Sequence, residues 1–270
     1  PMAEGSLSHV RAAGVAQIQL LGGVRIIVGG APLPSLRSGR ARALLAYLVL
    51  APDVAHLREA LGALFWPESS DAQARTNLRN VLHLLRQTAP ILDAALDATT
   101  TTLAWRPQGQ VVVDVHEFEA AVRAVRTTDP DSPELLIERC LAAVDLYGGE
   151  LLVGDLDDWV RARRARLNEE YRDILRRLVI AMIDCGRALE AVPYARRLVE
   201  SDPLDEVAHR LRIEAHDRAG DRANAIRAYH ECVATLEREL EVRPYPATVA
   251  LYDGLMQREP VGERASTTAS

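Results

Sequence analysis

The chain has 270 residues, 48% of them apolar, and a formal net charge of −6. This composition is typical of folded proteins, and the length predicts one large or two modest domains. The sequence contains no Lys, so all 32 positions counted as Lys or Arg are Arg, which excludes a P-loop, a Schiff-base lysine and a kinase lysine. No apolar run approaches the ~18 residues of a membrane span, so we expect a cytoplasmic protein with no membrane partner.

The sequence lacks the motifs of common enzyme and metal sites. It has no H-E-x-x-H, G-x-S-x-G or C-x-x-C motif, and His209 and His216 do not have the i,i+4 spacing of two zinc ligands on one helix. Cys140, Cys185 and Cys232 lie far apart and are expected to be apolar core residues rather than a disulfide framework. We therefore expect no catalytic residues, no metal and no cofactor.

Charge is distributed unequally along the chain. Residues 1–110 carry 10 Arg and 7 acidic residues, a balance of +3, whereas residues 111–270 carry 22 Arg and 31 acidic residues, a balance of −9. Seven of the Arg residues lie between Leu36 and Gln87. This asymmetry predicts two domains with different partners, a polyanion for the first and protein for the second.

The chain is expected to begin with a flexible tail over residues 1–16, which are small and polar. Two β-rich runs follow, residues 17–21 and 24–28, and the glycines after each predict a small antiparallel sheet. The apolar spacing then predicts a helix from residue 39 that stops at Pro52. A second helix is expected over residues 57–65.

A third helix is expected over residues 70–88, with Ser69 or Ser70 as its N-cap. The next β-rich runs, residues 96–99, 102–105 and 111–113, predict a hairpin and one further strand. A sheet, three helices and a hairpin are the element order of a winged helix. We therefore expect a winged-helix DNA-binding domain over residues 17–113.

The third helix has an apolar stripe and an opposite polar face. The stripe consists of Ala74, Leu78, Val81, Leu82 and Leu85. The polar face carries the residues that we expect to contact bases, Arg75, Thr76, Arg79, Asn80 and His83. In the major groove, Arg pairs with guanine and Asn with adenine. A solvated helix face is the alternative, but the two preceding helices and the following hairpin favour DNA binding because they supply a docking frame.

The second half of the chain is almost wholly helical. Helices are expected at 116–128, 133–147, 156–185, 188–201, 205–219, 221–241 and 246–257. An offset of 34 residues relates Ala181 to Ala215, Gly186 to Gly220, Ala191 to Ala225 and Val192 to Ile226. This is the tetratricopeptide period. We expect an all-α, tetratricopeptide-like repeat domain over residues 114–258 and a flexible tail over 259–270.

The densest basic run is not interpreted as a nucleic-acid patch. It consists of Arg161, Arg163, Arg164 and Arg166, on a helix that also carries Asp and Glu residues. Pairs at i,i+3 and i,i+4 are expected to neutralise much of this charge.

Eight segments, in this order, resemble a known family of bacterial regulators. Ile18–Val24, Arg40–Leu48, Leu61–Pro67 and Ala74–Arg86 resemble the OmpR-like winged helix of antibiotic-regulator-type (SARP) transcriptional activators. Val113–Glu119, Leu146–Leu152, Trp159 with Arg163–Tyr171, and Asp202–Glu206 resemble the bacterial transcriptional activator domain (BTAD) that follows it.

The resemblance implies a regulator that binds repeated promoter elements in double-stranded DNA, as a homodimer or higher assembly, and helps to recruit RNA polymerase or other transcription machinery. It also implies that the third helix enters the major groove with the five residues given above. The hairpin turn over residues 99–102 would be the wing. Its tip, Thr100-Thr101, lacks a basic residue and the Gly-Tyr of many such wings, so little minor-groove contact is expected.

Contacts to the DNA backbone are expected from Arg37, Arg40, Arg42, Arg86, Thr100, Thr101 and Arg106. The segment 35–42 opens the first helix, where free N–H groups and the positive end of the helix dipole favour phosphates. The alternative is that these Arg residues pair with acids such as Asp114 or Glu117.

Two alternatives to a DNA-binding activator stay open. The chain could be a protein-interaction module, or the N-terminal fragment of a larger multidomain signalling regulator, with a winged helix that does not bind DNA.

Overall fold

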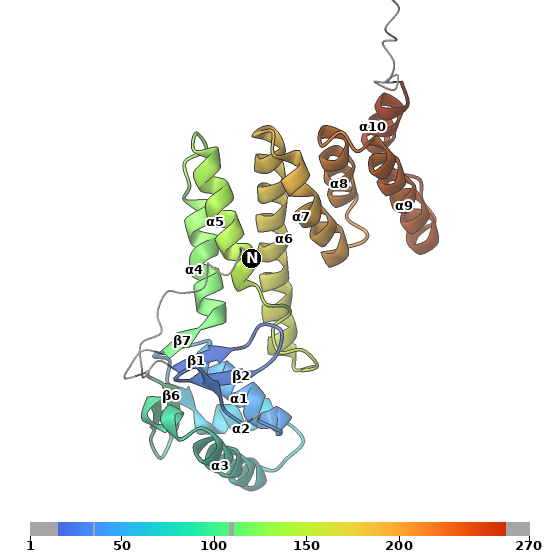
Figure 1. The fold of residues 1–270 in the computed structure, drawn as a ribbon. Coiled ribbons are helices and arrows are strands. Elements are labelled where there is room, and N and C mark those ends of the chain that lie inside the picture. Colours follow the sequence, from blue (N-terminus) through green and yellow to red (C-terminus); the bar gives the residue numbers. More distant parts are fainter. Residues whose placement is uncertain (1–15, 35, 108–110, 258–270) are drawn as a thin grey trace, which may run out of the picture. The chain divides into compact units, whose positions relative to one another are not determined.

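The computed structural model describes residues 16–34, 36–107 and 111–257 (Figure 1). They form two compact units. The first contains the residues up to Arg123 together with Asp145–Glu169, and the second contains Ala124–Val144 together with the residues from Glu170 onward. The expected domain boundary between residues 113 and 114 stays a prediction, and this grouping adds Asp145–Glu169 to the winged-helix side.

The first unit begins with a four-stranded sheet in the order β3-β2-β1-β7. Its strands are β1 (Ala16–Gln19), β2 (Arg25–Val28), β3 (Ala31–Pro32) and β7 (Val111–Val113). The expected antiparallel pairing of β1 with β2 is confirmed, with Gln17 opposite Ile27. β7 adds to the other edge of β1 in parallel, with Ile18 opposite Val113. Ala16 belongs to β1, so the strand starts one residue inside the expected tail.

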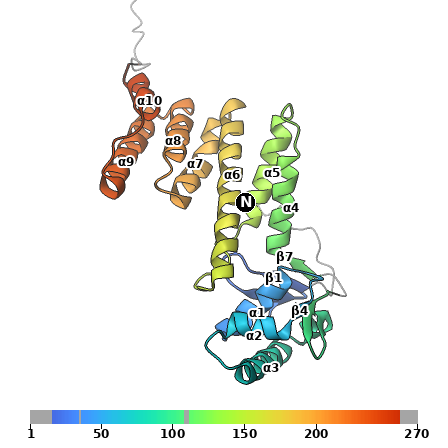
Figure 2. The ribbon, with the colours of Figure 1, turned by 180° about the vertical axis from the view of Figure 1, so that it is seen from behind.

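Three helices follow, as expected: α1 (Gly39–Val49), α2 (Arg58–Phe65) and α3 (Asp71–Thr88). The main differences from expectation are that α1 ends at Val49, before Pro52, and that α2 begins after a short strand β4 (His56–Leu57). In Figures 1 and 2, α1 lies between the strands β1 and β2 and the pair α2–α3. Its inward residues, such as Leu44 and Leu48, are fully buried there.

A 3₁₀ turn, η1 (Pro90–Ala95), leads from α3 into the expected hairpin of β5 (Leu96–Ala98) and β6 (Thr102–Trp105). β4 pairs with the other edge of β6 and completes a three-stranded sheet. The winged-helix element order is therefore confirmed, with β4 as an addition that the sequence did not predict.

A glycine turn after β1 joins a distant segment to this unit. Gly22 has φ +75°, and a Cβ at this position would lie 2.5 Å from the carbonyl oxygen of Gly148. The Gly22 N–H donates to the Glu150 carbonyl at 2.9 Å, and Leu21 forms a β-bridge with Leu151. Only glycine fits such a close backbone approach.

The Arg161–Arg166 run also lies in the first unit, at the start of α6 (Asp158–Asp184). Arg163 and Arg166 both pair with Glu119 of α4 (Asp114–Arg126). Arg164 donates to the carbonyls of Leu151 and Leu152 at 2.8 and 2.7 Å. Charge neutralisation is thus confirmed. Arg161 pairs with Asp158 at the expected i,i+3 spacing, whereas Glu119, the acid that pairs with Arg163 and Arg166, comes from another helix.

All the regular secondary structure of the second unit is helical within its described residues. The unit contains α7 (Ala188–Ser201), α8 (Glu206–Arg218), α9 (Arg222–Leu240) and α10 (Pro246–Gln257), most of α5 (Pro133–Leu146), and parts of α4 and α6. Each of α7, α8 and α9 packs against the next. The remaining expected tail residues, 1–15 and 259–270, lie outside the described residues.

The period of 34 residues is visible in the turns. Gly186 and Gly220 have φ +74° and +78°, in the left-handed region that favours glycine at the end of a helix. The residue after each glycine donates to a carbonyl five residues back, Arg187 to Met182 at 2.7 Å and Asp221 to His216 at 2.9 Å. The predicted repeat is therefore confirmed as two structurally equivalent helix ends.

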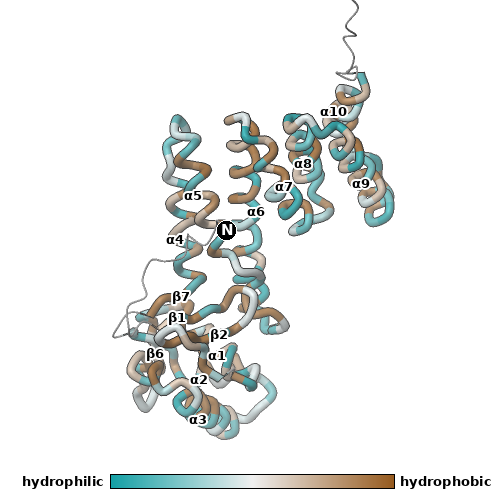
Figure 3. Tube along the Cα trace, viewed as in Figure 1, coloured by the Kyte–Doolittle hydropathy of each residue, from teal (hydrophilic) through white to brown (hydrophobic). Residues whose placement is uncertain are grey.

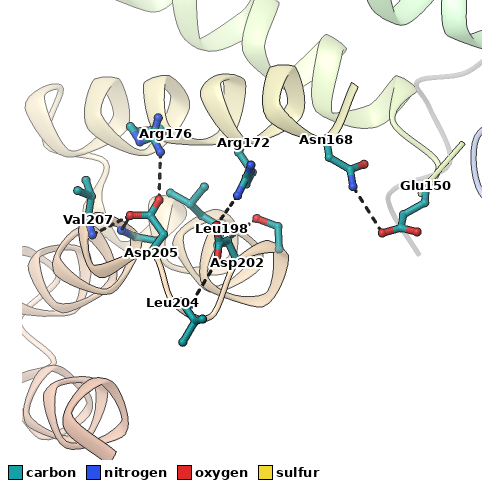
Figure 4. Close-up of polar contacts among 11 residues, drawn as sticks. Glu150, Asn168, Arg172, Arg176, Leu198, Asp202, Leu204, Asp205 and Val207 are labelled. Atoms are coloured by element: carbon teal, nitrogen blue, oxygen red, sulfur yellow. Dashed lines mark hydrogen bonds and ion pairs between the residues drawn. The ribbon is translucent and has the colours of Figure 1, made fainter. Parts of the chain in front are cut away.

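Ion pairs connect neighbouring helices of the second unit (Figure 4). Arg172 of α6 pairs with Asp202, and Arg176 pairs with Asp205 at 3.0 Å. Asp205 is also the N-cap of α8, because it accepts from the Val207 N–H at 2.9 Å. Asp202 and Asp205 thus link the connection between α7 and α8 to α6 through ion pairs.

All three cysteines are free, and burial raises the pKa of Cys140 to about 12 and that of Cys232 to about 11. Within the described residues, no helix has the length and apolarity that spanning a membrane requires.

Candidate nucleic-acid interface

Helix α3 presents the predicted base-contacting face to solvent. The Ser70 hydroxyl caps the helix by accepting from the Gln73 N–H at 3.4 Å. The apolar stripe predicted from the sequence is buried as a whole, since its members Ala74, Leu78, Val81, Leu82 and Leu85 are all less than 10% exposed. Hydrophilic and hydrophobic positions alternate along α3 in Figure 3, as an amphipathic helix requires. All five predicted base-contacting residues lie opposite this stripe and are exposed.

Four of these five side chains have their polar groups available. Thr76 donates its hydroxyl to the Ala72 carbonyl of the same helix at 3.0 Å. Arg75, Arg79, Asn80 and His83 make no side-chain hydrogen bond or ion pair with any described residue. The face therefore has unpaired donors and acceptors, which binding to base edges would use.

A groove runs along one side of this face, with a volume of about 260 Å³. We call it the α3–wing groove. It is lined by Leu57, Arg58, Glu59, Arg75, Leu78, Arg79, Thr100 and Thr101. It thus brings together two of the predicted base-contacting residues, the two predicted wing-tip residues and the start of α2.

The wing tip is held by its own threonines. The Thr99 hydroxyl oxygen accepts from the N–H groups of Thr101 and Thr102, at 3.2 and 2.9 Å. It also lies 2.7 Å from the Thr102 hydroxyl. Thr100 and Thr101 are exposed. The turn is therefore fixed locally, with its two outer residues facing solvent.

Arg58 connects the wing to α2. Its backbone N–H donates to the Thr101 carbonyl at 2.9 Å, and its side-chain Nε donates to the Thr102 carbonyl at 3.4 Å. Burial lowers the pKa of this guanidinium, and the positive charges of Arg86 and Arg79 lower it further. Arg79 and Arg86 thus add positive charge near Arg58, and Glu59 is the acid among the residues that line the groove.

Three of the predicted phosphate-contacting arginines are ion-paired and do not line the α3–wing groove, unlike the two wing threonines. Arg40 forms a bidentate pair with Asp157, at 2.9 and 3.0 Å. Arg86 pairs with Asp93 at 2.7 Å, and Arg106 pairs with Asp97 at 3.0 Å.

The two other arginines at the start of α1 also lie outside the groove lining. Arg42 donates to the Leu36 carbonyl at 2.8 Å, and Arg37 is exposed. The acids named as possible partners are not the ones observed, since Arg40 pairs with Asp157. Asp114 instead accepts from the N–H groups of Leu20 and Leu21.

Sequence reasoning missed Arg58 as a site residue. The available signal was its place among the seven Arg residues between Leu36 and Gln87. Assigning it a role requires the hairpin, because the carbonyls and hydroxyls around it come from residues more than 40 positions later in the chain.

Groups of three or more His, Cys, Asp or Glu side chains that could hold a metal ion do not occur within the part of the chain that the structure describes.

Comparison with known proteins identifies the family. Residues 113–256 match the family described as bacterial transcriptional activator domain, BTAD. This chain belongs to that family. It is 28% identical over 260 residues to the transcriptional regulatory protein MoaR1 of Mycobacterium tuberculosis, covering 93% of this chain and 82% of MoaR1. It is 30% identical to the regulatory protein AfsR of Streptomyces coelicolor, covering 95% of this chain but 26% of AfsR.

A solved structure shows the same fold. The structure described as Mycobacterium tuberculosis EmbR in complex with a low-affinity phosphopeptide matches with a TM-score of 0.71 at 24% identity, over 92% of this chain and 66% of that chain. The expected fold class, a winged helix followed by an all-helical domain, is thereby confirmed, as is the resemblance to SARP-type regulators. The relatives of this chain are named as regulatory proteins, and MoaR1 is named as a transcriptional regulatory protein.

Proposed function

We propose that this protein is a promoter-specific transcriptional activator that inserts α3 into the DNA major groove. The observation that supports this most strongly is the exposed polar face of α3, where four side chains lack partners among the described residues. A face used only for solvation would gain from local ion pairs, and Arg86 on the same helix has one. In this proposal Arg75, Thr76, Arg79, Asn80 and His83 contact base edges.

The backbone contacts of the proposal fall into two groups. Arg37, Thr100 and Thr101 are exposed and contact phosphates without rearrangement. Arg40, Arg86 and Arg106 exchange an acidic side chain for a phosphate, and Arg42 orders the chain before α1. Exchange of partners lowers the net gain from each such contact, because the ion pair in the free protein is lost.

In this proposal the helical repeats mediate dimerisation or contact with the transcription machinery. Promoter repeats require two or more winged helices at a fixed spacing, which a dimer provides. We assign to residues 114–258 this homodimer contact, or the contact with RNA polymerase or other transcription machinery.

Selection from a random duplex library, followed by a gel-shift titration, tests DNA binding. The wild-type protein is expected to enrich a repeated sequence and to bind it at least ~10³-fold more tightly than random duplex, the low end of the usual range. Arg218→Ala is the matched control, because Arg218 is an exposed arginine of α8 in the second unit. The control should bind like the wild type.

A second function, a protein-interaction module with a winged helix that does not bind DNA, is favoured by the charges. The whole chain has a net charge of −6, and three of the predicted phosphate contacts are already ion-paired. If the wild-type protein binds no duplex at ~50 mM salt, where non-specific binding is strongest, this second function replaces the first.

A further inference from the structure

The α3–wing groove has the chemical character of an anion site. Three arginines, Arg58, Arg75 and Arg79, line it together with the wing-tip threonines. Glu59 supplies the opposing charge in this lining. A guanidinium donates two parallel hydrogen bonds to a phosphate, and a hydroxyl can donate a third. The groove therefore concentrates donors and positive charge around one open volume.

Arg58 differs from the two other arginines because its position is fixed. It is half-buried. Its backbone N–H donates to the Thr101 carbonyl, and its side-chain Nε donates to the Thr102 carbonyl. With Nε directed to the wing, the two terminal nitrogens of the guanidinium have no partner among the described side chains. Arg75 and Arg79 lie on an exposed helix face and are free to extend toward base edges.

Three sources of phosphate fit this chemistry: a nucleic-acid backbone, a free nucleotide and a phosphorylated peptide. The groove favours the backbone, because it opens beside the exposed face of α3 and is bounded on the other side by the wing tip. When a recognition helix lies in the major groove, elements that flank it come close to the sugar-phosphate backbone, and contacts to phosphates fix the register of the protein on the duplex. The residues that line the groove include no aromatic side chain, so a nucleobase inside it would have no ring on which to stack.

We infer that Arg58, with Thr100 and Thr101, holds one phosphate of the DNA backbone in the α3–wing groove and thereby sets the register of α3 in the major groove. This inference rests on the proposed function. Arg58 is then a positioning residue: it contacts no base, and it fixes the distance between the strand and the base-reading side chains. Glu59 weakens the site by repulsion, which keeps non-specific binding low.

Replacement of Arg58 by Gln tests the site. Arg58→Gln should weaken binding to random duplex by about tenfold, as loss of a charged hydrogen bond does. It should weaken binding to the selected duplex by at least that factor, because the register of α3 is lost as well. The slope of log K against log salt should fall by ~0.9, the value for one phosphate. Glu59→Gln should tighten binding to both duplexes, and Arg218→Gln is the control that should change neither.

A neutral phosphate in the DNA locates the contact. Methylphosphonate groups are placed one at a time along the selected duplex, and each duplex is titrated with the wild type and with Arg58→Gln. One position per half-site should weaken the wild type about tenfold and leave Arg58→Gln unchanged, because the partner of that phosphate is already absent. Additive losses at every position would overturn the inference.

Arg58 also supports the wing, so the stability of the variant is measured by thermal melting. If Arg58→Gln melts well below the wild type, Thr101→Val provides the test, since it keeps the backbone carbonyl that Arg58 uses and removes the hydroxyl. Thr101→Val should bind the unmodified duplex more weakly than the wild type and lose less affinity than the wild type at the same methylphosphonate position. Wild-type affinity and wild-type sensitivity at that position would overturn the inference.

The outcomes distinguish this inference from the proposed function. If the wild type binds DNA, and Arg58→Gln keeps both its affinity and its salt slope, the phosphate site is wrong while the proposed function stands. If the wild type binds no duplex, the proposed function fails, and the inference fails with it.

Discussion

Asp114 offers the sharpest test of how the first unit is held together. Its carboxylate accepts from the N–H groups of Leu20 and Leu21, each at 2.9 Å, and from its neighbour Val115 at 2.8 Å. Leu20 and Leu21 are almost fully buried, so water cannot replace the lost acceptor. Asp114→Ala therefore leaves two buried donors unpaired, at a cost of ~1–3 kcal/mol each.

Removal of the carboxylate also contributes a stabilising change to the free energy of unfolding, because a buried charge is lost. Burial raises the pKa of Asp114, which means that the folded protein holds this charge at some cost, although the three N–H groups oppose the shift. We therefore expect a net loss of about 2–3 kcal/mol in the free energy of unfolding, at the lower end of the range for two donors. Urea denaturation followed by circular dichroism measures it. Glu117→Ala, an exposed acid on the same helix, is the control and should change the free energy by less than ~0.5 kcal/mol. A loss for Asp114→Ala no larger than that of the control would refute the reasoning.

Three further predictions concern DNA binding and pH. Arg79→Ala and Asn80→Ala should each reduce the preference for the selected over the random duplex by about 1–3 kcal/mol, and equal losses on both duplexes would assign these residues to the backbone. Arg37→Gln should lower the salt slope by ~0.9, whereas Arg40→Gln should keep most of it and lower the free energy of unfolding by at most ~1 kcal/mol, because Arg40 is already paired with an acid. Burial lowers the pKa of His116 below 6.5, so the folded protein resists its protonation and stability should fall as the pH drops below 6.5. Melting temperatures between pH 7.5 and 5.5 check this, and His116→Gln should reduce the fall.

Local sequence patterns predicted the helices of this protein well. The buried stripe of α3, its N-cap Ser70 and the glycines 186 and 220 all follow from spacing within one helix or one repeat. Such features depend on residues that are close in the chain. The limits of α7 and α10 were predicted to the residue for the same reason.

The pairing of distant segments could not be predicted in this way. β7 joins β1 in parallel although Val113 follows Ile18 by 95 residues, and the β-bridge between Leu21 and Leu151 spans a greater distance. The ion pair that occupies Arg40 has the same origin, since Asp157 is 117 residues away. The sequence contains both partners of each pair but no local signal that they meet.

The candidate DNA surface illustrates why net charge is a poor guide to a nucleic-acid partner. DNA responds to the charge within about a Debye length, ~10 Å at moderate salt, rather than to the sum over the chain. Arg161–Arg166 is the densest basic run, yet its side chains are held by acids and backbone carbonyls of the same unit. The α3 face exposes only two arginines of the groove, Arg75 and Arg79, but no described acid pairs with them, and Arg58 lies beside them. The surface able to attract a phosphate strand is therefore determined by which arginines are not engaged in an ion pair, and among the described residues Arg58, Arg75 and Arg79 are three such arginines beside the face that has the chemistry to recognise bases.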